Sequence, residues 1–249
     1  MKKLFTLVAC LALIGSLMAQ NTFKGIIKYK VESSGEVAFQ IPAEAANAEI
    51  LVNGSRIYTK STIFMASPFS ESVLVNDRTM TSCDNYSQLL SYLRNNGSEF
   101  TYQGDGKLLS KSTLTQEDID QLVVPDTEPG HFYFEYVDGE TKEIAGIVAK
   151  KVIRHAFDSD GKDQPVEMWY TDEMGPQYNM LFMGLKGIPL MCKQDAGEGK
   201  AITFTAIEVV KGKVKDADFL LPDGYQTLSD DEMRTLGTEI QEELELLQE

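Results

Sequence analysis

The chain is dominated by short segments in which apolar and polar residues alternate, joined by tight-turn sequences. Near its start, Ile27, Tyr29 and Val31 alternate with charged residues, the period-two pattern of a half-buried strand. The turn sequences Asn53-Gly54-Ser55, Asn76-Asp77-Arg78 and Gly104-Asp105-Gly106 indicate hairpins. Strands and helices do not alternate, which argues against a doubly wound α/β fold. We therefore predict a mainly β (α+β) fold, with roughly ten to twelve strands in one large, curved antiparallel sheet and helices on one side.

The stretch from Glu143 to Lys193 is the most distinctive part of this pattern. Two strand-like runs flank a polar turn, the only tryptophan (Trp169) follows that turn, and a Gly-Leu-Lys-Gly-Ile-Pro-Leu segment ends the stretch. Aspartate, serine and glycine are typical turn residues, so the turn needs no ligand to explain it. We expect this stretch to form one wall of the sheet.

The C-terminal segment has the pattern of an amphipathic helix. Ser229 and Glu232 form a capping box, in which each residue can bond the backbone N–H of the other. Apolar residues then recur at helical spacing, at Met233, Leu236, Ile240, Leu244 and Leu247. We predict a helix over 229–248 whose apolar stripe docks on the body of the protein, with partner binding as the alternative. Because no repeat or linker interrupts the chain, residues 20–249 are predicted to form a single domain.

The N-terminal segment resembles a secretory signal peptide. Lys2 and Lys3 precede an apolar run that ends at Met18-Ala19, and the polar Gln20 follows. This run is too short and wrongly flanked for a membrane span. We expect residues 1–19 to be a signal peptide cleaved after Ala19, which directs the protein to the periplasm. Lipidation at Cys10 is the less favoured alternative, because the apolar core before it would be very short.

The charge balance narrows the range of partners. Lysine and arginine total 23 against 38 acids, for a formal net charge of −15. Nucleic acids and anionic membrane surfaces both require basic patches, so neither is expected as a partner. Beyond Cys10, the chain has two cysteines, Cys83 and Cys192. An oxidising compartment permits a disulfide between them, but two buried free thiols fit the sequence equally well.

We find no residue pattern that indicates catalysis or a cofactor. The two histidines, His131 and His155, lack a metal-ligand spacing and an identifiable orienting partner. The acids around Gly161 do not match a calcium loop, because that glycine comes one position too early. A serine nucleophile elbow and a phosphate-binding glycine loop are also missing from the sequence. We therefore predict a protein that is not an enzyme and that uses no metal or cofactor.

Four segments resemble a group of exported Gram-negative proteins of unknown function. EIAGIVAKKV, VEMWYTDEMG, GLKGIPLMCK and DADFLLPDGYQTLS are similar to the conserved segments of GLPGLI-like families, in the same order from about Gly146 to Tyr225. Lys186 replaces the proline of the signature, and Ala149 stands where relatives often carry a cysteine. The resemblance implies a fold similar to the lipoprotein carriers LolA and LolB, an incomplete β-barrel that encloses helices and has an apolar interior.

These observations predict a periplasmic, non-enzymatic carrier or binding protein for a lipid or another apolar ligand. Possible ligands include lipoprotein acyl chains, which would lie against the concave face of the sheet. The candidate lining residues are Phe132, Phe134, Tyr136, Trp169, Tyr170, Met180, Phe182, Leu185 and Ile188. The alternative is a structural or interaction protein of the cell envelope, in which the same residues form a filled core and another envelope protein is the partner.

Overall fold

The computed structural model describes residues 23–34, 47–60, 69–125, 130–174, 182–197 and 200–247. The predicted signal peptide at 1–19 lies outside these ranges. The strands are β1 (Lys24–Ser34), β2 (Asn47–Asn53), β3 (Arg56–Thr59), β4 (Ser70–Asn76), β5 (Thr79–Asn85), β6 (Lys107–Thr113), β7 (Phe132–Ile144), β8 (Ile147–Ala156), β9 (Val166–Thr171), β10 (Ile188–Gly197), β11 (Lys200–Lys211) and β12 (Gln226–Thr227). The helices are α2 (Ser87–Asn95), α3 (Gln116–Leu122), the 3-10 helix η2 (Asp216–Phe219) and α4 (Asp230–Leu246).

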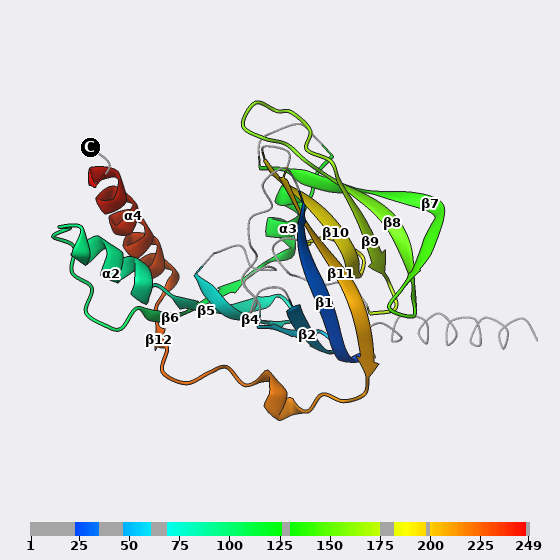
Figure 1. Ribbon diagram of the computed structural model, residues 1–249, viewed down its shortest axis with the longest axis horizontal. Coiled ribbons are helices and arrows are strands. Elements are labelled where there is room, and N and C mark those ends of the chain that lie inside the picture. Colours follow the sequence, from blue (N-terminus) through cyan, green and yellow to red (C-terminus); the bar gives the residue numbers. More distant parts are fainter. Residues whose placement is uncertain are drawn as a thin grey trace, which may run out of the picture.

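All twelve strands belong to one open sheet. Its order is β12-β6-β5-β4-β3-β2-β1-β11-β10-β9-β8-β7, so the edge strands β12 and β7 stand at opposite ends. Neighbouring strands are antiparallel, except that β12 pairs in parallel with β6. Figure 1 shows β7 to β11 bending into a curved wall, while β4 to β6 extend away from it. The predicted mainly β fold with a large curved sheet is confirmed, with a mixed pairing at one edge.

The predicted tight turns form where short-range chemistry specifies them. Gly54 between β2 and β3 and Asp77 between β4 and β5 both have positive φ angles, 63° and 52°. The hairpin predicted at Gly104-Asp105-Gly106 is wrong, because the segment before it is not a strand and β6 pairs with β5 instead. Phe100 and Tyr102 from that segment pack against the apolar faces of α2 and α4.

The main hydrophobic core lies on one face of the curved wall. It takes alternate residues of β1, including Ile27, Tyr29 and Val31, and the facing residues of β2 and of β8 to β11. Burial of each such side chain stabilises the fold by about 1.5–3 kcal/mol. The hydroxyl of Tyr29 donates to the carbonyl of Pro189 across 2.7 Å. This bond joins the start of the chain to the Gly-Leu-Lys-Gly-Ile-Pro-Leu segment.

The helices occupy different places on the sheet. Figure 1 shows α2 and α4 at the end of β5 and β6, away from the curved wall. There Leu236 and Ile240 of α4 pack with Leu93 of α2 and Leu108 of β6, so the predicted stripe is docked on the protein. α3 lies beside the curved wall, where Ile119 clusters with Phe132 of β7 and Met183. On another part of the sheet, Phe219 of η2 packs with Leu51 and Tyr58. The expected enclosure of helices therefore applies to α3 alone among the described helices.

The described helices also bear on membrane insertion. Within the described ranges, we find no helix with both the length and the apolar character that a membrane span requires.

Candidate functional site

A row of aromatic side chains lies along the core face of β7. Because alternate residues of a strand share a face, Phe132, Phe134 and Tyr136 project together. The ring centroids of Phe132 and Phe134 are 6.0 Å apart, and those of Phe134 and Tyr136 are 6.5 Å apart. Tyr170 of β9 extends the row, with its centroid 5.5 Å from that of Tyr136. We call these four residues the aromatic row. Phe132 and Tyr170 are buried, whereas Phe134 and Tyr136 are half-buried.

The loop before β10 closes one end of the aromatic row. The backbone N–H of Lys186 donates to the hydroxyl of Tyr136 across 3.1 Å, and the Lys186 ammonium lies 4.6 Å from the centre of that ring. Gly187 allows this loop to approach β9, because a Cβ atom there would lie 2.0 Å from the carbonyl oxygen of Thr171. The predicted lining residues Phe182, Leu185 and Ile188 are buried in the main core, and Met180 lies outside the described residues.

Trp169 lies apart from the aromatic row. It precedes Tyr170 in β9, so the two side chains project to opposite faces of the strand. The ammonium groups of Lys142 and Lys151 lie 4.1 Å and 6.0 Å from the centre of the Trp169 ring. The indole N–H donates to Glu167 across 3.1 Å. Eight of the nine predicted lining residues are described: seven lie on the core face of the sheet, and Trp169 lies on the opposite face.

Arg154 lies beside the aromatic row, on the core face of β8, and it belongs to none of the motifs found in the sequence. It stands opposite Phe134 of β7, and Val152, two residues earlier, is completely buried. Its guanidinium carbon lies 4.5 Å from the centre of the Phe132 ring. The Nε atom is buried without a hydrogen-bond partner. Burial lowers the pKa of the Arg154 guanidinium, and the nearby Cys192 only partly opposes this effect.

His155, the next residue, has the opposite surroundings. Its Nδ1 lies 2.7 Å from a carboxylate oxygen of Asp163, and its Nε2 lies 3.1 Å from one of Glu135. Its ring stacks on Tyr133, with centroids 4.7 Å apart. His155 thus links β7, β8 and the turn after β8, an arrangement suited to holding these segments together.

The two cysteines are free thiols buried in different parts of the sheet. Cys83 lies in β5 and Cys192 in β10, with five strands between them in the sheet order. Burial raises the pKa of Cys192 to about 12, and burial also raises the pKa of Cys83. Thiols of this kind are poor nucleophiles and poor metal ligands at neutral pH. In the described part of the chain, no group of three histidine, cysteine or acidic residues is arranged to hold a metal ion.

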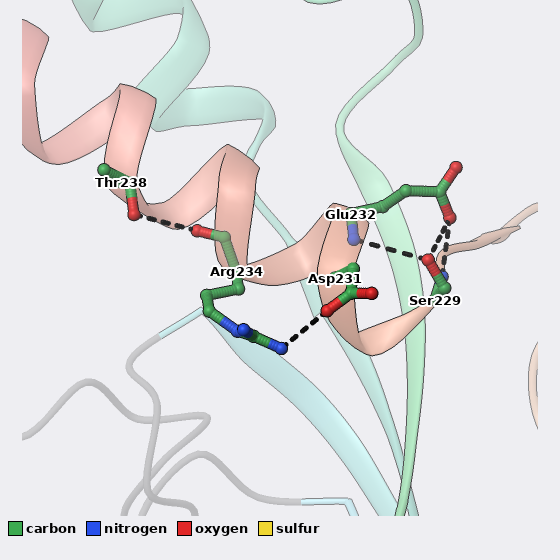
Figure 2. A network of polar contacts seen from close by, with 5 residues as sticks. All are labelled: Ser229, Asp231, Glu232, Arg234 and Thr238. Carbon is green, nitrogen blue, oxygen red and sulfur yellow. Dashed lines mark hydrogen bonds and ion pairs between the residues drawn. The ribbon is translucent and has the colours of Figure 1, made fainter.

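A second, more open site lies beside the first turns of α4. It is a cleft of about 510 Å³, lined by Tyr102, Gln103, Gln226, Leu228, Asp231, Glu232, Thr235, Leu236 and Glu239. Figure 2 shows that Glu232 is engaged in the cap with Ser229, and that Asp231 is paired with Arg234. The cleft has an apolar floor and an acidic rim, so it is suited to a basic group rather than to an anion.

Comparisons with known proteins give weak similarities only. No protein-family model matches the chain, and no curated protein matches it. Among solved structures, the chain is similar to PNGF-II (12% identity, TM-score 0.47), over 85% of this chain and 33% of that one. It is also similar to MucB in complex with MucA(peri), with 13% identity and a TM-score of 0.31, over 82% of this chain and 55% of that one. A LolA superfamily protein from Nitrosomonas europaea gives 10% identity and a TM-score of 0.29, over 80% and 91%.

The chain thus spans about a third of the first of these structures and about half of the second. Similarities at this level carry no argument about the function of this chain.

Proposed function

We propose that this protein is an exported, non-enzymatic carrier or binding protein for a lipid or another apolar ligand. The supporting observation is the aromatic row, in which Phe134 and Tyr136 stay half-buried between two buried rings. An apolar ligand that covers these two rings removes their surface from water, which stabilises the complex by about 25 cal/mol for each Å² buried. The periplasm as its location and a LolA-like mode of action belong to this proposal.

The mechanism is burial rather than chemistry. β7 is an edge strand, so its core face is reached from the open side of the sheet. Aromatic rings offer broad apolar surfaces that accept acyl chains of varied shape. The ligand would lie along the row from Phe132 toward Tyr136, with the loop at Lys186 beside its far end.

Native mass spectrometry of the gently purified full chain tests the proposal, together with uptake of the fluorescent methyl ester of cis-parinaric acid. Phe134→Ala should weaken ester binding by about tenfold, because the loss of a buried aromatic contact costs more than about 1.4 kcal/mol. Tyr133→Ala is the matched control, because Tyr133 is adjacent on β7 but stacks on His155 instead. A protein that carries no ligand and does not bind the ester would contradict the proposal.

The acidic cleft beside α4 supports a second candidate function, binding of another envelope protein through a basic segment. Glu239 lines this cleft, and the described part of the chain provides it with no ion-pair partner. Deletion of residues 230–249 would remove docked apolar residues as well, so Glu239→Lys is the sharper variant. Loss of a co-purifying partner at an unchanged melting temperature would favour this function. A partner that still binds the variant would count against it.

A further inference from the structure

Among the described residues, Arg154 has no counter-ion, whereas Lys151 and His155 on the same strand each have two acidic partners. The chain has 38 acids, yet none of those described forms an ion pair with its guanidinium. The acids next to Arg154 in register are Glu135 on β7 and Glu167 on β9. Glu135 binds His155, as does Asp163, and Glu167 pairs with Lys151, all on the other face. Strand alternation thus gives two carboxylates to His155 and none to Arg154.

The surroundings of Arg154 are those of a binding surface rather than of a salt-bridge network. Phe132 lies under its guanidinium, and Phe134 and Val166 stand opposite it on the two neighbouring strands. A buried charge without a partner destabilises a folded protein unless something else compensates it. Stacking on Phe132 compensates only part of that cost, because a cation–π contact leaves the N–H donors unsatisfied.

We infer that Arg154 binds the oxyanion headgroup, a carboxylate or a phosphate, of an amphiphile whose apolar chain lies along the aromatic row. This inference rests on the proposed function and adds a ligand class to it. The planar guanidinium fork pairs with such oxyanions through two parallel hydrogen bonds. Because the site is partly removed from water, the attraction is stronger there than at an exposed cation.

Lys186 is the competing cation at the other end of the aromatic row. Its side chain is exposed, and its ammonium lies over Tyr136. An exposed ammonium remains hydrated and screened by salt, so it discriminates less between charged and uncharged ligands. The headgroup is therefore assigned to Arg154, and the apolar chain runs toward Lys186.

The test compares binding of cis-parinaric acid with binding of its uncharged methyl ester by the full chain. The wild type should bind the acid more tightly than the ester by about tenfold or more, the usual effect of one hydrogen bond to a charged group. In Arg154→Met this preference should disappear while ester binding persists, which also shows that the variant is folded. Arg154→Lys should keep part of the preference, and Arg234→Met, which removes an exposed guanidinium on α4, should keep all of it.

Each contrary outcome has a distinct meaning. Equal binding of acid and ester by the wild type would overturn the role of Arg154 but leave the proposed apolar site intact. A preference lost in Lys186→Met and retained in Arg154→Met would move the headgroup to Lys186. If neither probe binds, the proposed function fails, and this inference fails with it. The last experiment uses inorganic phosphate alone. If neither probe binds, but phosphate raises the melting temperature of the wild type and not that of Arg154→Met, the site binds a free anion and the inference of an amphiphile is wrong.

Discussion

At the residue scale, Tyr225 attaches the segment after η2 to the rest of the sheet. Its hydroxyl donates to the Glu71 carboxylate at the start of β4, and the side-chain amide of Asn85 donates to the other oxygen across 2.7 Å. The hydrogen bond from Tyr225 is the largest cause of a lowered pKa for Glu71. A carboxylate with a lowered pKa in the folded state stabilises the fold above its unfolded pKa, and that contribution is lost as the pH falls through the folded value.

We therefore expect Tyr225→Phe to lower the free energy of unfolding at pH 7, because the substitution removes the hydrogen bond to the Glu71 carboxylate. The expected loss is about 1 kcal/mol, since solvent screens a hydrogen bond at this largely exposed site. The difference from the wild type should shrink once the pH falls below the range in which Glu71 ionises. Urea unfolding at pH 7 and at progressively lower pH measures it, with the exposed Tyr92→Phe as control. A difference that is the same at every pH would contradict the assignment to the charged carboxylate.

At the element scale, α4 depends on the cap at its first turn (Figure 2). The Ser229 hydroxyl accepts the N–H of Glu232 at 3.3 Å, and the Glu232 carboxylate accepts the N–H of Ser229 at 2.7 Å. Ser229→Ala should lower the free energy of unfolding by about 1 kcal/mol, because the helix N-terminus keeps an unsatisfied donor.

Thr238→Ala is the matched control within α4. The Thr238 hydroxyl donates to the carbonyl of Arg234 in the middle of the helix, where alanine is an excellent helix former. Thr238→Ala should change the free energy of unfolding by no more than about 0.5 kcal/mol. Chemical denaturation followed by far-UV circular dichroism measures both variants. Equal effects of the two substitutions would show that the cap does not limit the stability of this helix.

At the scale of the whole molecule, two apolar clusters hold different parts of the sheet. The main core spans β1 to β4 and β7 to β11, whereas a separate cluster joins α2 and α4 to β6 (Figure 1). Local units of this kind open with free energies below that of global unfolding. Leu236→Ala removes a buried side chain from the smaller cluster, a change that typically costs about 2–5 kcal/mol.

In hydrogen exchange, Leu236→Ala should therefore accelerate the amides of α2, α4 and β6 and leave those of β1 and β11 near their wild-type rates. Phe204→Ala, in the main core, is the comparison and should accelerate exchange throughout the sheet. If Leu236→Ala accelerates exchange equally in every strand, the two clusters unfold as one cooperative unit, which would contradict this prediction.

The separation of Trp169 from the aromatic row illustrates what sequence patterns predict well and poorly. Alternation correctly places Phe132, Phe134 and Tyr136 on one face. The same rule applied to β9 separates Trp169 from Tyr170, although the sequence prediction included both residues in the lining of one pocket. Alternation along β8 predicts the face on which Arg154 lies, but it does not predict which side chains surround it. The absence of a described acid beside Arg154 depends on the register of β7 against β8.

The sequence by itself determined the elements whose stabilising contacts are local: the alternating strands, the tight turns at Gly54 and Asp77, and the capped C-terminal helix. Each of these depends on residues within a few positions of one another. Only the tertiary structure decided that β11 pairs with β1, that β12 joins β6 in parallel, and that α2 and α4 lie away from the curved wall. Those arrangements depend on which distant backbone edges and apolar faces meet, and no local pattern specifies such a choice.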